Sequence, residues 1–261
     1  MTDPIDSEPE QVTVEEWILR LDKIGAAIHS TMQTLRVPVH NDDDKDLSRT
    51  TKSLLLFLVT QAAAIREIIR TENASAAYPN LRSLFEATVE LEYLLRHGNK
   101  FINARKMMIY ALREWRSLLA EIASDEQEAA ELVRVNVQLD EYRQRDPVAM
   151  KAIDDLRWGH HWSGQSRTNL IKTVDSRIGP DPGWMAQFYR TLSWEAHATT
   201  ACLLNVREIE VDGELVHRHA HSMTPAENRA NVAEYTARIL IYAWNLFCDA
   251  FGLDLWEGSQ I

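Results

Sequence analysis

The chain has few cysteines, no long apolar run and fewer basic than acidic residues, and each of these features excludes some classes of protein. Two cysteines, Cys202 and Cys248, occur in 261 residues without zinc or redox spacing, so we expect buried thiols in a reducing cytoplasm. The longest apolar runs, 54–59 and 239–244, are too short to span a bilayer, so no membrane partner is expected. Residues 1–11 have no apolar segment typical of a signal peptide. The chain has 39 acidic and 28 basic residues, and the resulting net charge of −11 argues against non-specific DNA binding.

The familiar catalytic and metal-binding motifs are also absent. The chain has no glycine-rich phosphate loop, nucleophile elbow or His-Glu-x-x-His sequence, which removes the commonest enzyme classes. Glu86 and Glu90 are spaced as in ferritin-type sites, but the Glu-x-x-His that such sites take from two further helices is missing. His217, His219 and His221 would share one face of a strand, yet no cysteine or carboxylate at ligand spacing accompanies them. We therefore expect no metal and no cofactor.

Helical periodicity is what the chain does contain. Nine glycines and eight prolines leave long windows in which apolar residues recur every three or four positions. Asp212-Gly213 separates two short alternating segments, which predicts a small β-hairpin at 207–219. The fold class is therefore all-α, an antiparallel multi-helix bundle with this hairpin near its C-terminal third. The expected helices cover approximately 14–35, 51–71, 79–97, 101–122, 125–142, a short segment from 147, a segment from 166, 184–206 and 225–251.

The expected domain organisation is one main bundle with an N-terminal extension. Residues 1–50 comprise a tail, a first helix and an acidic linker at 41–46, which we expect to be a solvated connection. Residues 51–261 form the main helical domain. Gly98 and Asp146-Pro147 are a typical helix stop and a typical helix start.

The segment 189–197 carries the clearest chemical pattern. Arg190 and His197 are seven positions apart, almost two helical turns, so they share one helix face with Ser193 between them. Arginine stays charged and histidine titrates near neutrality, so the pair could stabilise an anion and move a proton. Arg190, His197 and Ser193 are therefore the candidate catalytic residues.

Charged residues on an otherwise apolar helix form a second candidate site. Arg82, Glu86 and Glu90 follow one another at four-residue intervals among leucines. Burying one of them unpaired would cost about 3–5 kcal/mol. Spacing favours an Arg82–Glu86 ion pair on a partly exposed stripe. The alternative is that Glu86 or Glu90 faces across the bundle to Arg190 or His197 and orients it. We expect Arg82 and Glu86 to lie in a hydrogen-bonded network that reaches Tyr189, a further binding candidate, Ser193 or His197.

Aromatic and histidine residues interrupt the helices between 158 and 165. We expect Trp158 and Trp162 to pack against the helix 184–206, since each indole has a large apolar surface and one N–H that needs a partner. His160 and His161 are adjacent and cannot point the same way, so packing or hydrogen bonding within the loop is the simpler interpretation of both. Trp158, His161 and Trp162 complete the candidate binding residues.

Three of these stretches resemble a bacterial family known as domain of unknown function 5677. The resemblance spans about 54–206 and implies a helical bundle with a polar centre but no assigned activity. It rests on Asn80 to Glu86, on Trp158 to Ser166, and on Tyr189 with Leu192, Ser193 and His197; the implied polar centre consists of Arg82, Glu86, Tyr189, Ser193 and His197.

A looser similarity is to the HEPN superfamily of helical bundles. In that superfamily an Arg and a His separated by four to six residues form a metal-independent RNA-cleaving site at a dimer interface. Arg190 and His197 enclose six residues, and Thr191 stands where the motif usually has Asn, Asp or His. This similarity implies a homodimer with RNA as a partner.

Two functions and one purely structural interpretation follow. The preferred function is a ligand- or partner-binding module whose polar centre lies between helices, with a small molecule as ligand. The alternative is a metal-independent endoribonuclease of a toxin or phage-defence system, in which Arg190 stabilises the phosphate charge and His197 transfers a proton. The third interpretation treats Tyr189, Ser193 and His197 as a buried hydrogen-bonded network.

Overall fold

The structure is a computed structural model that describes residues 12–34, 40–71, 74–156, 160–178, 184–196, 206–211, 214–219 and 225–253. Within these residues the all-α prediction is confirmed. The helices are α1 (Val14–Thr34), α2 (Asp42–Arg70), α3 (Tyr78–Arg96), α4 (Lys100–Ile122), α5 (Glu126–Arg145), α6 (Pro147–Asp154), α7 (Arg167–Ile178), α8 (Trp184–Ala196) and α10 (Pro225–Phe251), with a 3-10 helix at Ala74–Ala77. Strands β1 (Val206–Val211) and β2 (Glu214–His219) pair antiparallel, as predicted for the hairpin.

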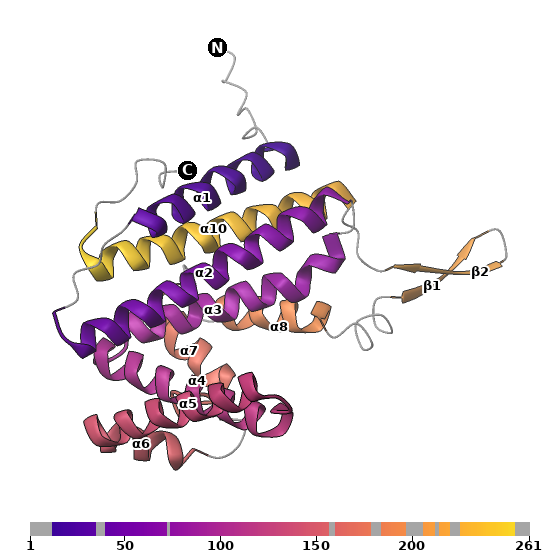
Figure 1. The fold of residues 1–261 in the computed structure, drawn as a ribbon. Coiled ribbons are helices and arrows are strands. Elements are labelled where there is room, and N and C mark those ends of the chain that lie inside the picture. The colour runs from indigo at the N-terminus through magenta and orange to yellow at the C-terminus, as the bar shows by residue number, and fades with distance from the viewer. Residues whose placement is uncertain are drawn as a thin grey trace.

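Four long helices lie side by side in the order α1, α10, α2, α3 (Figure 1). The central helix α2 buries Leu55, Leu58 and Ile65 completely, because its apolar residues recur at helical spacing. From α1, Leu21 and Ile24 enter the same hydrophobic core. The first helix therefore packs on the main bundle, and the boundary expected at residue 50 falls inside α2.

The acidic residues 41–46 belong to the start of α2, so the expectation of a solvated linker there is wrong. Asn41 caps the helix, since its side chain accepts a 2.9 Å hydrogen bond from the backbone N–H of Asp44. Asp42, Asp43 and Asp44 occupy the first turn, where the helix dipole stabilises negative charge. An acidic run directly after a cap residue thus marks a helix start here.

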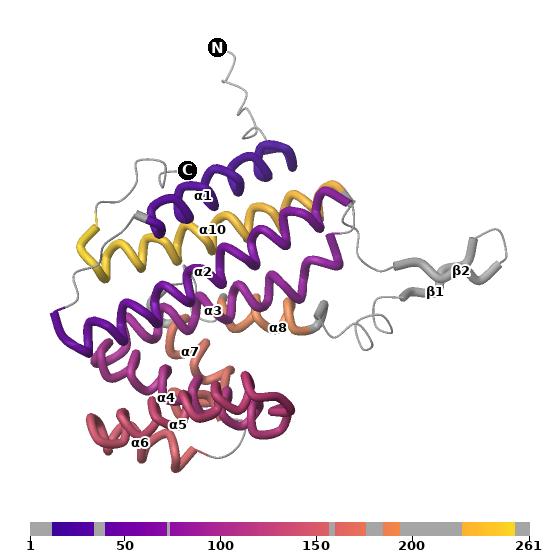
Figure 2. The backbone as a smooth tube through the Cα atoms, in the orientation of Figure 1, coloured from indigo at the N-terminus to yellow at the C-terminus, as the bar shows by residue number. Residues whose placement is uncertain are grey.

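Helices α4, α5 and α6 form the lower part of the molecule in Figure 1, and the tube in Figure 2 follows the chain through them. Asn99, Asp125 and Asp146 cap these three helices by accepting backbone N–H hydrogen bonds. Pro147 occupies the first turn of α6, as predicted. Gly98 follows α3 with a φ of 70°, a conformation that favours glycine.

The remaining predictions about the fold have mixed outcomes. Val206 begins β1, so the helix predicted over 184–206 ends earlier, and α8 reaches Ala196 in the described part. Cys248 is buried, and burial raises the pKa of its thiol to about 11, whereas Cys202 lies outside the described residues. None of the helices in the described part combines the length and the apolar character needed to cross a bilayer.

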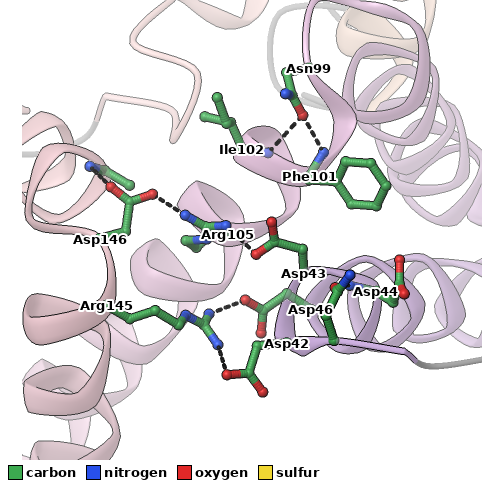
Figure 3. Close-up of polar contacts among 12 residues, drawn as sticks. Asp42, Asp43, Asp44, Asp46, Asn99, Phe101, Ile102, Arg105, Arg145 and Asp146 are labelled. Atoms are coloured by element: carbon green, nitrogen blue, oxygen red, sulfur yellow. Dashed lines mark hydrogen bonds and ion pairs between the residues drawn. The ribbon is translucent and has the colours of Figure 1, made fainter.

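Two arginines, each paired with two aspartates, hold the start of α2 against α4, α5 and α6 (Figure 3). Arg105 of α4 lies between Asp43 of α2 and Asp146, the cap of α6, and pairs with both. We call this cluster the helix-end clamp. Its other members are Arg145, Asp42, Asp46 and Tyr142, whose hydroxyl donates a 2.6 Å hydrogen bond to Asp46.

Candidate functional site

The charged stripe of α3 begins with Arg82 and Glu86. Arg82 Nε donates a 2.9 Å hydrogen bond to Glu86 Oε1, one helical turn along. The same guanidinium donates to the Tyr189 hydroxyl on α8 at 3.1 Å and lies 5.3 Å from the centre of the tyrosine ring. The Arg82–Glu86 ion pair is therefore confirmed, and so is a network that reaches Tyr189. The residue of α3 that crosses to α8 in this network is Arg82, in place of the expected Glu86 or Glu90.

Glu90, one turn further along α3, takes partners from two other segments. Arg167, the first residue of α7, donates to Glu90 Oε1, and its guanidinium lies 3.8 Å from Glu86 Oε2. His161 Nε2 lies 3.2 Å from the same oxygen of Glu90. Burial alone would raise the pKa of Glu90, but the contact with His161 and the charge of Arg167 outweigh it and hold that pKa below its ordinary value of 4.5. In the structure the polar centre is a different set from the one that the resemblance implies, with which it shares Arg82, Glu86 and Tyr189. Its members are Arg82, Glu86, Glu90, His161, Arg167 and Tyr189.

The loop before α7 fixes the ring of His161. Its Nδ1 accepts a 3.2 Å hydrogen bond from the backbone N–H of Ser163 and lies 2.8 Å from the Ser163 hydroxyl. Since Nδ1 is an acceptor, we assign the ring hydrogen to Nε2, which faces Glu90 without the alignment of a full hydrogen bond. Both ring nitrogens are thus directed at protein groups, and His161 positions Glu90.

Trp162, the residue after His161 in this loop, is buried, but its partners differ from those expected. Its indole stands edge-on to Tyr93 of α3, with ring centres 5.6 Å apart, and tilts against His161 at 5.1 Å. The prediction placed it against the helix 184–206. In the described part its Nε1 has no hydrogen-bond partner, and Trp158 lies outside the described residues.

A groove of about 880 Å³ opens beside the polar centre. Glu90, His161 and Arg167 line one end of it. This volume falls within the range of small-molecule sites, roughly 300–1,000 Å³. The opposite wall is one face of α4, formed by Met107, Tyr110, Ala111, Glu114, Trp115 and Leu118.

The α4 wall remains open to solvent although it is largely apolar. Trp115 is held by a 3.3 Å hydrogen bond from its Nε1 to Glu131 of α5, and 41% of the residue is exposed. Leu118 and Ile122 continue the exposed apolar stripe along the helix. We did not identify this wall from the sequence. The available signal was a helix with a second apolar stripe beside the stripe that faces the core.

Asp175 of α7 holds the start of α8. Its buried carboxylate accepts hydrogen bonds from the backbone N–H groups of Met185 (2.9 Å) and Ala186 (3.4 Å). A carboxylate at this place satisfies first-turn N–H groups and complements the helix dipole. Asp175 therefore fixes the end of the helix that carries Tyr189. No local sequence signal connects the two, since the cap comes from a different helix.

The candidate catalytic residues are not brought to the polar centre. Phe188 and Tyr189 of α8 both pack on Phe85 of α3, and Tyr189 also binds Arg82. Arg190, about 100° further round the helix than Tyr189, is exposed. The expected contact of Glu86 or Glu90 with Arg190 is wrong, because Arg82, Arg167 and His161 occupy those carboxylates. Ser193 Oγ is buried, with no hydrogen-bond partner in the described part of the chain. His197 lies outside the described residues.

Potential metal ligands do not cluster in the described residues, where no group of three or more His, Cys, Asp or Glu side chains could hold an ion. Glu86 and Glu90 pair with arginines and His161. The side chains of His217 and His219, and all of His221, lie outside the description.

A family model matches residues 51–214, which is more than half of the chain. The chain belongs to the family of unknown function DUF5677. The DUF5677 segment contains the whole polar centre and the α4 wall, whereas α1 and α10 lie outside it. No curated protein and no solved structure matches the chain significantly.

Proposed function

We propose that the protein is a binding module that takes a small amphipathic molecule into the groove beside the polar centre. The main support is the position of Glu90, His161 and Arg167 at one end of a groove whose other wall is apolar. In small-molecule sites apolar walls supply affinity, and a few fixed polar groups set the orientation of the ligand. The ligand would lie with its apolar body on α4 and its polar end toward a carboxylate of the groove.

The contacts of His161 favour binding over acyl-transfer chemistry in this groove. Ser163 is hydrogen-bonded to His161, but Ser163 is not among the residues that line the groove. A nucleophile has to reach the bound substrate. Since Nδ1 of His161 is taken by Ser163 and Nε2 faces Glu90, the ring offers no free nitrogen as a base.

The alternative function is the HEPN-like, metal-independent ribonuclease, acting as a homodimer. Its support is the exposed position of Arg190, which leaves that guanidinium accessible to a phosphate. It uses residues outside the polar centre, so the two functions can be tested separately.

The binding proposal can be tested with three naphthalene compounds that differ in charge: (2-naphthylmethyl)trimethylammonium, 2-naphthalenemethanol and 2-naphthalenesulfonate. Binding is measured by saturation-transfer NMR and calorimetry. Ala111→Phe places a ring in the groove, and Ala120→Phe, at an exposed position of α4 outside the groove lining, is the matched control. We expect at least one compound to bind, and to be displaced by Ala111→Phe alone. Binding of none, or equal binding by both variants, would reject the proposal.

A further inference from the structure

The charges that line the groove do not cancel. Arg167 is paired with Glu90, and Arg82 is paired with Glu86, so the polar centre is close to neutral. Glu114 of α4 adds a carboxylate to the opposite wall. Glu114 forms no ion pair or hydrogen bond with the described part of the chain, and its neighbours three and four positions away are the uncharged Tyr110, Ala111, Ser117 and Leu118. Among the carboxylates and guanidinium groups that line the groove, Glu90, Glu114 and Arg167, one negative charge is therefore in surplus.

Three aromatic rings line the same groove as the carboxylates. Tyr110 and Trp115 come from α4, and Trp162 comes from the loop. Aromatic faces attract organic cations, and tryptophan does so most strongly. The indole of Trp115 is held in place by Glu131, so ordering it on binding costs little additional entropy.

The pKa of the Tyr110 hydroxyl depends on burial and on the charges around this wall of the groove. Burial raises the pKa of its hydroxyl, and the charges of Glu114 and Glu90 raise it further. Arg113 and Arg167 act in the opposite direction and do not reverse the shift. Glu114 and Glu90 therefore both act on the Tyr110 hydroxyl, which lines the groove with them.

We propose that the ligand of this groove is an organic cation, an ammonium group attached to a flat apolar body. The ammonium lies near Glu114 and the ring faces of Tyr110 and Trp115, while the apolar body covers Leu118, the next apolar side chain of the α4 wall. This inference rests on the proposed binding function and specifies its ligand class.

An anionic ligand fits the groove less well. The guanidinium of Arg167 already has Glu90 and Glu86 beside it, so its charge is largely compensated. An anion that approached Arg167 would also meet Glu114 across the groove. Like charges repel unless a cation lies between them.

The charge series of naphthalene compounds tests the ligand class directly. We expect the trimethylammonium compound to bind about tenfold more tightly than the alcohol and the sulfonate, the size of one cation–π contact combined with one partly screened ion pair. Glu114→Gln should remove most of this preference. Glu121→Gln is the matched control, since Glu121 is exposed on α4 and lies outside the groove lining. Trp115→Leu should weaken binding of the cation more than binding of the alcohol.

The outcomes separate this inference from the binding proposal. A sulfonate or alcohol that binds as tightly as the cation, and is still displaced by Ala111→Phe, overturns the cation inference and leaves the binding module intact. Equal loss of the cation preference in Glu114→Gln and Glu121→Gln overturns the inference as well, because the attraction would then come from the general negative charge. Absence of binding by all three compounds overturns both proposals.

Discussion

The polar centre and the helix-end clamp use the same chemistry in different surroundings. In each, an arginine lies between two carboxylates: Arg167 with Glu90 and Glu86, and Arg105 with Asp146 and Asp43. The arginine of the clamp is the more buried, with 13% of its side chain exposed against 33% for Arg167. Solvent therefore reaches the arginine of the polar centre more than the arginine of the clamp.

Helix ends explain the aspartates of the clamp. Asp146 caps α6, and Asp43 lies in the first turn of α2, so both would be favourable without any arginine. The acids of the polar centre lie inside α3, where no helix-end effect stabilises them. Helix-end effects therefore do not explain why these two glutamates lie inside an apolar helix. Ligand binding in the adjoining groove would explain it.

The hollows beside the two clusters also differ. Beside the clamp lies a cavity of about 520 Å³, walled by charged and amide side chains with Tyr142 as its aromatic residue. The groove beside the polar centre has an apolar wall on α4. Since apolar contact provides most of the affinity for a small ligand, only the second hollow has the composition of a binding site.

The largest expected effect is loss of the clamp. Arg105→Ala leaves Asp146 and Asp43 without their cation, and removal of one partner from a largely buried pair costs about 3 kcal/mol. Urea unfolding should show this loss, while binding of the naphthalene compounds stays unchanged. Arg143→Ala is the control, because Arg143 and its partner Asp140 are both exposed, so it should leave the unfolding midpoint nearly unchanged. Similar midpoints for the two variants would contradict a structural role of the clamp.

Disruption of the polar centre should destabilise the fold less than loss of the clamp does, and it should also weaken ligand binding. Arg167→Gln leaves Glu90 with His161 alone, and we expect a loss of about 2 kcal/mol because Arg167 is partly exposed. Weaker binding in the groove should accompany it, in contrast to Arg105→Ala. If Arg167→Gln destabilises the protein without any change in binding, the polar centre is a second clamp.

The pH dependence of the same variant provides a sharper test. The folded-state pKa of Glu90 is lowered, so its pairing stabilises the fold above pH 4.5 and this contribution is lost as the pH falls through the folded value. Arg167→Gln removes much of that contribution. The difference in unfolding free energy between the unmodified protein and the variant should be largest above about pH 5 and should shrink below about pH 4. A pH-independent difference would show that Arg167 acts through packing.

A smaller effect is expected at Asp175. Asp175→Asn keeps one side-chain oxygen for the backbone of α8 but loses the negative charge at the helix N-terminus, at a cost of about 1 kcal/mol. Amide hydrogen exchange at Met185 and Ala186 should accelerate more than exchange in α2. Unchanged exchange at these two amides would show that α8 is held by its packing alone.

Sequence reasoning recovered what local interactions determine. Helical periodicity and side-chain caps act within a few residues, so the helices, the hairpin and the Asp146-Pro147 start were predictable. Charges on an apolar helix need partners, and this argument correctly joined Arg82 and Glu86 to Tyr189.

The features of the site that the sequence did not predict depend on tertiary contacts. Arg167 reaches Glu90 only after α7 packs on α3, and nothing in the spacing of the two residues indicates it. His161 was a candidate for its place in an aromatic loop, but its orientation depends on Ser163 and on Glu90. The α4 wall was overlooked because an exposed apolar stripe and a buried one look alike in a sequence.

The smallest effect on stability is expected at Arg190, outside both clusters. Its side chain is exposed on α8, so Arg190→Ala should leave the unfolding midpoint nearly unchanged. The ribonuclease alternative predicts a separate effect, since the loss of a cation that stabilises a phosphate transition state lowers the cleavage rate by orders of magnitude. The measurement is cleavage of a single-stranded RNA in EDTA at neutral pH by the unmodified protein, Arg190→Ala and His197→Ala. Since we propose a binding module, we expect no cleavage by any of the three. Metal-independent cleavage that both substitutions abolish, with the fold intact, would establish the nuclease and move the functional site from the polar centre to the exposed side of α8.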